Sequence, residues 1–140
     1  MKYESLFTCG AVNTVADGLL WINAKVDGTH TTFVVYSIHN LLGVLDLKSK
    51  CVVRTIRGCT GNITSISYCS LGNGVIVVTA ACDDGSVRCF SHEPQSPLVE
   101  WSSSHQLEGL TASTSALHCY TLENRVLVCA ADSKGKLAVW

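Results

Sequence analysis

The segments Gly85-Ser86-Val87-Arg88-Cys89-Phe90 and Gly135-Lys136-Leu137-Ala138-Val139-Trp140 follow one pattern, 50 residues apart. Each begins with glycine and ends in an aromatic residue. The apolar runs 76–81 and 126–131, which precede these segments, match at the same spacing without a gap. An earlier copy at 40–45 lies 45 residues before the first segment. Self-similarity at a nearly fixed period indicates a repeat architecture.

The rest of each repeat also has the pattern of short strands. Segment 54–60 resembles segment 105–111, and segment 63–68 resembles segment 114–119. Apolar and β-branched runs of about four to eight residues are typical of strands. They alternate here with turn residues such as Gly72-Asn73-Gly74, which allow tight turns. Because no window of helical length shows a 3.6-residue apolar period, these patterns predict an all-β fold.

Each repeat is predicted to hold about four strands in 45–50 residues, which is typical of a propeller blade. The central strands are apolar throughout, which suits a sheet that lies between two other sheets. We therefore predict a single all-β domain over residues 1–140, a partial β-propeller of about three four-stranded, WD-like blades. Blade 1 covers about residues 12–57, blade 2 about 58–107, and blade 3 about 109–140 and is incomplete.

Three blades do not close a ring, since propellers need about 4 to 8. An open arc exposes two apolar faces, and terminal repeats normally carry polar caps. We therefore expect the chain to be the N-terminal fragment of a longer protein or the product of a truncated gene model.

Segment 80–90 resembles the strand–turn–strand core of the WD-repeat family. In that family a small residue precedes a turn aspartate, a serine or threonine, and a strand that ends in tryptophan. Gly58 and Gly109 match the glycine of the family's Gly-His pair. The resemblance implies a β-propeller with structural turn positions at Gly58, Asp84, Ser86, Gly109 and Trp140.

The sequence departs from the family pattern in every repeat. Cys59 and Leu110 stand where the family has histidine, and Phe90 replaces a tryptophan. Asp132 lies two residues earlier than the turn aspartate of the family. We therefore expect that the family's His–Ser–Asp–Trp hydrogen-bond network does not form in full in any repeat.

Within this family, the order of features is most similar to the N-terminal region of the WD-repeat subunits of Elongator complexes. The features are Phe7-Thr8-Cys9, then Gly18-Leu19-Leu20-Trp21, then Leu45-Asp46-Leu47, and a third blade from Gln106-Leu107-Glu108-Gly109. The resemblance implies a non-catalytic scaffold whose partners are the other protein subunits of a complex that modifies tRNA wobble uridines. A WD-repeat adaptor in ubiquitin ligation, trafficking or RNA processing is the first alternative, and a propeller-fold enzyme is the second.

The charge balance limits the partners. Ten Lys and Arg oppose eleven Asp and Glu, which does not suggest a broad basic surface for nucleic acid. A loose basic cluster of Lys48, Lys50, Arg54 and Arg57 is either a solvated outer strand or a contact for an acidic partner or a tRNA backbone. The electrostatic contact would be weak and would not read sequence. Trp101 either packs on an outer strand or contributes to a partner interface.

The eight cysteines lie mostly in strand-like runs, where a free thiol behaves as a small apolar group. With no signal peptide at the N-terminus, we expect free thiols in a reducing compartment, the cytoplasm, with the nucleus as a second location. No cysteine or histidine pair has zinc spacing, although a site assembled from distant strands remains open. Asp83-Asp84 is interpreted as a turn and not as a carboxylate pair for catalysis. We expect no catalytic residue, cofactor, small-molecule substrate or membrane span.

Overall fold

The computed structural model describes residues 13, 15 and 17–140, and the segment Phe7-Thr8-Cys9 lies outside the described residues. Over the described part, the chain forms eleven strands and no helix. The predicted all-β fold is confirmed. Within the same residues, no helical segment has the length and apolar character needed to cross a membrane.

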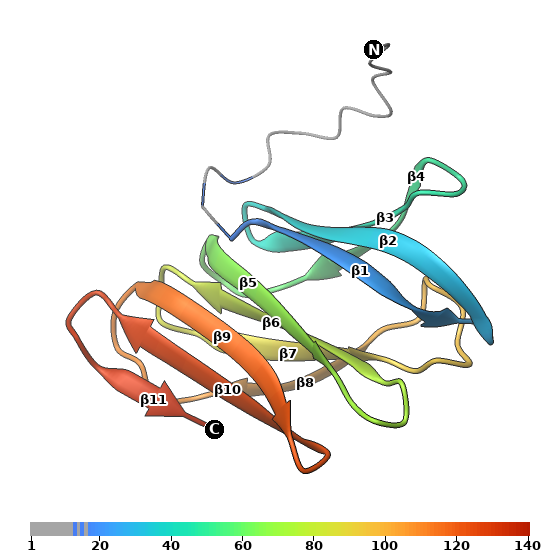
Figure 1. Cartoon of the computed structure of the whole chain (residues 1–140). Helices are drawn as coiled ribbons and strands as arrows, with labels where there is room; N and C mark the ends of the chain where they lie inside the picture. Colours follow the sequence, from blue (N-terminus) through green and yellow to red (C-terminus); the bar gives the residue numbers. More distant parts are fainter. Residues whose placement is uncertain (1–12, 14, 16) are drawn as a thin grey trace, which may run out of the picture.

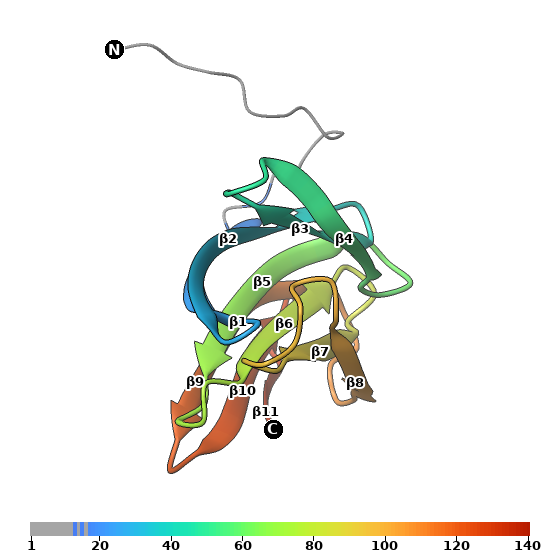
Figure 2. The same cartoon turned by 90° about the vertical axis from the view of Figure 1, so that its right-hand side faces the viewer.

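The strands form three antiparallel sheets in which sequence neighbours pair. The first sheet contains β1 (Leu19–Val26), β2 (Thr29–Ile38), β3 (Leu41–Asp46) and β4 (Cys51–Arg57). The middle sheet contains β5 (Ile63–Ser70), β6 (Ile76–Cys82), β7 (Val87–His92) and β8 (Ser102–Leu107). The last sheet contains β9 (Thr114–Leu122), β10 (Arg125–Asp132) and β11 (Leu137–Val139). The first and last sheets lie on opposite sides of the middle sheet, so the stack is not closed (Figures 1 and 2).

The 50-residue repeat of the sequence is a repeat of strand register. In the middle sheet Ala81 pairs with Ser65 of β5 and Val87 of β7. In the last sheet the residues at the matching positions, Ala116 of β9 and Leu137 of β11, pair with Ala131. Both sheets also have a register shift at matching positions. The shift lies between Ile63 and Ser65 in the middle sheet and next to Asp132 in the last sheet.

One hydroxyl fills each of these register shifts. Thr64 donates to the Ala81 carbonyl at 3.2 Å, and Ser115 donates to the Ala131 carbonyl at 3.2 Å. A bulge places an extra residue against one partner and leaves its backbone outside the ladder. The two irregularities are therefore built in the same way, which shows that the repeat extends to side-chain detail.

Apolar residues form one core in each gap between sheets. The core between the first and middle sheets includes Ile22, Phe33 and Phe90, none of which is more than 1% exposed. The core between the middle and last sheets includes Val87 and Cys119. All seven residues of β6 are buried, because a sheet lies on each side of this strand. This placement explains why β6 is apolar on both of its faces.

The expectation that all cysteines are free thiols is wrong for one pair. Cys59, in the segment that leads into β5, and Cys82, the last residue of β6, form a disulfide with an S–S distance of 2.00 Å and a Cα–Cα distance of 6.6 Å. The pair forms because the segment before β5 packs beside the end of β6, which the 23-residue separation in sequence did not reveal. The cysteines therefore no longer argue for a reducing compartment.

Candidate interaction edge

Turns of all three sheets gather along one side of the stack with the segments that lead into the sheets. We call this side the turn edge. It comprises the turns at 39–40, 83–86 and 133–136, with segments 58–62 and 108–113. Backbone hydrogen bonds join these parts: Gly58 N–H donates to the Asn40 carbonyl at 2.8 Å, and Ser133 N–H donates to the Ser113 carbonyl at 2.8 Å.

Asp84 links the turn of the middle sheet to the segment that leads into that sheet. Its carboxylate accepts the Ser86 hydroxyl at 2.6 Å and the Ser86 N–H at 2.9 Å. It also accepts the Thr60 hydroxyl and, at 3.1 Å, the Gly61 N–H. Partial burial raises the pKa of this carboxyl, but the hydrogen bonds from Ser86, Thr60 and Gly61 outweigh burial and lower the pKa to about 2. The Asp84 and Ser86 positions expected from the WD-repeat resemblance are thus in direct contact.

We expect the Asp84 network to stabilise the fold least in acid. A carboxyl with a pKa of about 2 in the folded state and of about 3.9 in the unfolded chain contributes stability that is present above pH 4 and is lost as the pH falls towards about 2. Asp84→Asn should lower the free energy of unfolding at pH 7 by about 1 kcal/mol, a modest figure because solvent screens an exposed carboxylate.

Urea unfolding at pH 7 and near pH 2 measures both effects. The variant should lose less stability between the two pH values than the wild type does, since the titrating group is gone. Equal losses in the two proteins would show that Asp84 is not the group that responds.

Asp132 makes the same kind of link in the last sheet, although it comes two residues earlier than expected. It accepts the backbone N–H groups of Lys134 at 3.0 Å and Lys136 at 2.9 Å from its own turn. It also accepts the Thr111 N–H at 3.3 Å from the segment that leads into the sheet. The hydrogen bond from the Lys136 backbone is the main cause of the lowered pKa of Asp132. An aspartate can therefore join turn and leading segment from either position.

In the first sheet the linking side chain comes from the leading segment instead of the turn. Asn13 donates from Nδ2 to the carbonyls of His39 at 2.9 Å and Ile63 at 2.8 Å. Its Oδ1 accepts the His39 N–H at 2.6 Å. The sequence reasoning missed Asn13, since no turn aspartate marks this repeat. A short polar residue ahead of the first strand was the only available signal.

The two predicted glycines lie in the leading segments, and each has a steric reason to be glycine. A Cβ on Gly58 would lie 2.8 Å from Cδ1 of Ile63 and 3.1 Å from the Asn40 carbonyl oxygen. Gly109 has a φ of 139°, which side chains disfavour. Trp140 donates its indole N–H to the Glu108 carbonyl at 2.8 Å. The described network therefore holds Trp140 through the backbone beside Gly109, not through a serine.

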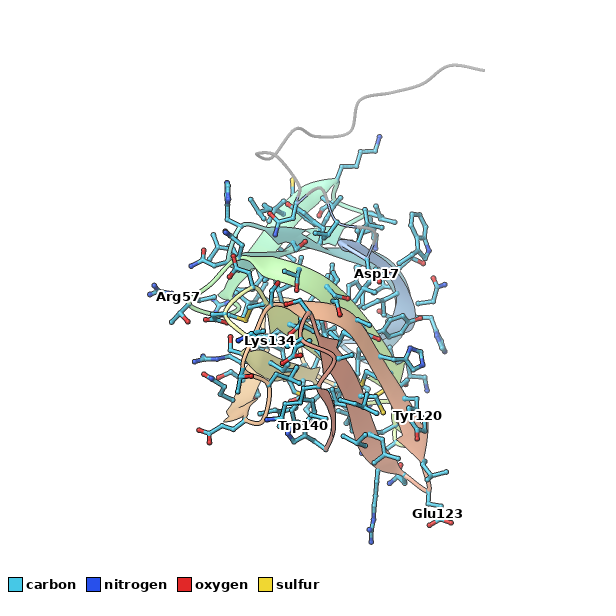
Figure 3. The ribbon with its side chains drawn as sticks, turned by 90° about the vertical axis from the view of Figure 1, so that its left-hand side faces the viewer. Asp17, Arg57, Tyr120, Glu123, Lys134 and Trp140 are labelled. Atoms are coloured by element: carbon cyan, nitrogen blue, oxygen red, sulfur yellow. A yellow bond between two sulfur atoms is a disulfide. The ribbon has the colours of Figure 1, made fainter. Side chains whose placement is uncertain are left out.

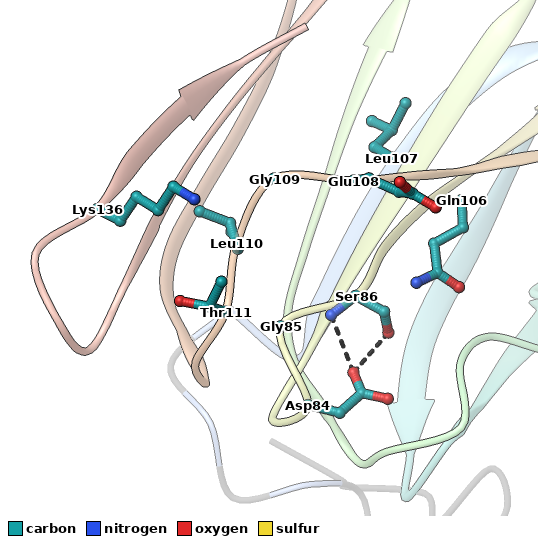
Figure 4. A pocket seen from close by; sticks show the side chains of 10 residues that line it. All are labelled: Asp84, Gly85, Ser86, Gln106, Leu107, Glu108, Gly109, Leu110, Thr111 and Lys136. Atoms are coloured by element: carbon teal, nitrogen blue, oxygen red, sulfur yellow. Dashed lines mark hydrogen bonds between the residues drawn. The ribbon is translucent and has the colours of Figure 1, made fainter.

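A polar hollow of about 410 Å³ opens on the turn edge between the middle and last sheets (Figure 4). Its rim carries charges of both signs, from Asp84 and Glu108 on one side and Lys136 on the other. Segment 106–111 lines the same rim. A polar rim with charges of both signs suits a segment of another protein better than an apolar small molecule.

The four cations of the predicted basic cluster do not form one patch. Lys48 and Lys50 lie in the turn before β4, Arg54 lies within that strand, and Arg57 ends it beside the turn edge. All four are exposed. From residue 51 to residue 57 an extended strand covers about 20 Å, so the lysines and Arg57 lie at opposite ends of β4. Figure 3 shows Arg57 on the opposite side of the molecule from Glu123, which lies in the turn between β9 and β10.

Two of the predicted contact residues, Arg54 and Trp101, do line a common hollow of about 340 Å³. Trp101 is half-buried and packs edge-on against Phe33 with ring centroids 6.2 Å apart. It also lies 5.2 Å from the His92 ring and donates its indole N–H to the Leu98 carbonyl at 2.8 Å. The structure thus places most of this tryptophan against the core between the first and middle sheets.

In the described part of the chain, no three His, Cys, Asp or Glu side chains come close enough together to hold a metal ion. No protein-family model matches the sequence, and no curated protein matches it.

Proposed function

We propose that this chain is a non-catalytic interaction scaffold, a partial WD-repeat β-propeller that belongs to a complex modifying tRNA wobble uridines, as the Elongator resemblance implies. Its partners are the other protein subunits of that complex, and it uses no cofactor and no small-molecule substrate. We place it in the cytoplasm, with the nucleus as a second location. The three repeated sheets are its blades.

The observation that carries the proposal is the linked turn edge. Each sheet fixes its turn to its leading segment through one polar side chain, which is Asn13, Asp84 or Asp132. A rigid frame of this kind holds loops of different sequence in fixed positions, which is how scaffolds present binding surfaces. The Asp84–Ser86 contact supports the WD-repeat type in particular.

The Elongator part of the proposal is supported by the order of sequence features and by the places of the exposed cations. Arg57 at the turn edge and Lys48 and Lys50 at the far end of β4 are exposed. Separated cations suit a weak contact with a tRNA backbone that lies along the stack, since phosphate contacts add attraction without reading sequence.

The experiment is affinity purification of the tagged full chain from its own cells, followed by mass spectrometry of the retained proteins. We expect the other Elongator subunits. Lys136→Glu, on the rim of the hollow at the turn edge, should reduce their recovery at least tenfold, whereas the matched control Lys25→Glu, at an exposed position of β1, should not.

The outcomes separate the parts of the proposal. Recovery of a different stable assembly would overturn the Elongator assignment and keep the scaffold. Recovery of no partner would overturn the scaffold itself. Equal losses with Lys136→Glu and Lys25→Glu would show that the hollow is not the contact surface.

A further inference from the structure

Two thiols meet in the core between the middle and last sheets. Cys69 of β5 and Cys119 of β9 are both buried, with exposed fractions of 7% and 2%. The Cys119 thiol donates to the Cys69 sulfur across 3.0 Å, although the two residues are 50 positions apart in the sequence. Neither of them takes part in the Cys59–Cys82 disulfide. The structure therefore contains a second facing pair of sulfur atoms, in the reduced form.

Hydrogen bonds between β5 and β9 hold this pair of thiols in place. The two strands pack against each other (Figure 1). The Cys119 N–H donates to the Ser67 hydroxyl at 3.0 Å, and the Thr121 hydroxyl donates to the Ser70 carbonyl at 2.9 Å. Ser67 and Ser70 lie on either side of Cys69 in β5. Because a disulfide bond is about 2.05 Å long, the two sulfurs need to approach by only about 1 Å to form one.

The surroundings of the pair favour uncharged sulfur. Burial raises the pKa of the Cys119 thiol above its ordinary value, and the contact with Cys69 raises that pKa further. Val77 and Val128 belong to the same core, and a thiolate among such residues is costly. A disulfide carries no charge and needs no atom beyond the two sulfurs already there. The core can therefore hold the oxidised pair as well as the reduced one.

We propose that a peroxide converts Cys69 and Cys119 into a disulfide that ties the last sheet to the middle sheet. The Cys69 sulfur, the more exposed of the two, attacks one peroxide oxygen. The O–O bond breaks, and the Cys69 proton leaves with the other oxygen as water. The Cys119 sulfur then displaces hydroxide from the Cys69 sulfenic acid, and the hydroxide takes the Cys119 proton as a second water. Two thiols thus lose two electrons, which reduce one hydrogen peroxide to two waters.

The bond would make the last sheet harder to open. The last sheet packs on the middle sheet chiefly through the contact of β9 with β5, so local opening of the sheet requires β9 to leave β5. A covalent link between these two strands opposes that step, and a cross-link over 50 residues restricts the opened chain strongly. Backbone amides that exchange with solvent through local opening should then exchange more slowly. This consequence does not depend on the proposed function.

The test compares the purified full chain before and after hydrogen peroxide, by peptide mapping without reduction and by hydrogen exchange. We expect a peroxide-dependent peptide that joins Cys69 to Cys119, and amide exchange in β9 and β10 that is slower by at least about tenfold. Cys119→Ala should show neither change, and dimedone should trap its Cys69 as a sulfenic acid. The matched control Cys51→Ser removes an exposed thiol and should respond as the wild type does.

The peptide map of the wild type decides the proposal even if a variant does not fold. A wild-type chain that lacks the Cys69–Cys119 peptide after peroxide would overturn it. A map in which either cysteine is joined mainly to Cys89, which packs against the same core, would also overturn it. Equally slowed exchange in peroxide-treated Cys119→Ala would show that another oxidation slows the last sheet, against the proposed tie. Loss of Elongator partners in the purification above leaves the map unchanged, so the two proposals fail separately.

Discussion

Replacing Phe33 with alanine is expected to lower the free energy of unfolding by about 3–5 kcal/mol. Phe33 is fully buried in the core between the first and middle sheets, and its ring packs edge-on against Trp101. Removal of the ring loses its transfer free energy and leaves a cavity that strands on both sides cannot fill. Because domains of this size are stable by only about 5–15 kcal/mol, this single change should bring the chain close to unfolding.

Urea unfolding followed by circular dichroism measures this effect. The control is Val99→Ala, since Val99 is an exposed apolar residue outside that core and its loss should change the stability by no more than about 0.5 kcal/mol. A Phe33→Ala protein within about 1 kcal/mol of the wild type would show that the first and middle sheets do not pack as described.

Removal of the Cys59–Cys82 disulfide is expected to lower the free energy of unfolding by about 3 kcal/mol. The bond closes a loop across a separation of 23 residues, and cross-links over loops of this length restrict the unfolded chain by about this amount. Both cysteines are buried. Replacement by alanine removes the cross-link and takes only the sulfur atom from each side chain, so it leaves little new space. Urea unfolding of Cys59→Ala/Cys82→Ala at neutral pH gives the value.

A reductant provides the matched control. Dithiothreitol should destabilise the wild type by a similar amount and should leave the double variant unchanged. A wild type that does not respond to reductant would contradict the account. The result also bears on the proposed location, because a reducing cytoplasm would keep these cysteines as thiols and the chain would then lack this part of its stability.

The repeat could be predicted from the sequence because strand register and period leave a regular trace. Val87 and Leu137 occupy matching positions in the sequence and in the sheets. The apolar run over 76–81 likewise indicated a strand covered on both faces, and β6 is buried throughout. These features depend on local pattern, which a single sequence contains.

The disulfide and the links along the turn edge could not be predicted, because they depend on how leading segments pack against turns. Cys59 lies next to Cys82 only after the end of β6 meets the segment before β5. Asp132 lies two residues from the expected position, yet its carboxylate reaches Thr111. The four cations of the predicted basic cluster do not form one patch, for the opposite reason. Lys48 and Arg57 are near in sequence, but an extended strand separates them.

As a proposed scaffold of an Elongator-like complex, this chain is expected to support wobble-uridine modification without performing chemistry itself. The most direct test is quantitative mass spectrometry of nucleosides in tRNA from cells depleted of the chain and then resupplied with it. We expect that modified wobble uridines fall on depletion and return with the wild-type chain, but return only in part with Lys136→Glu. Unchanged levels of modified wobble uridines after depletion would contradict it.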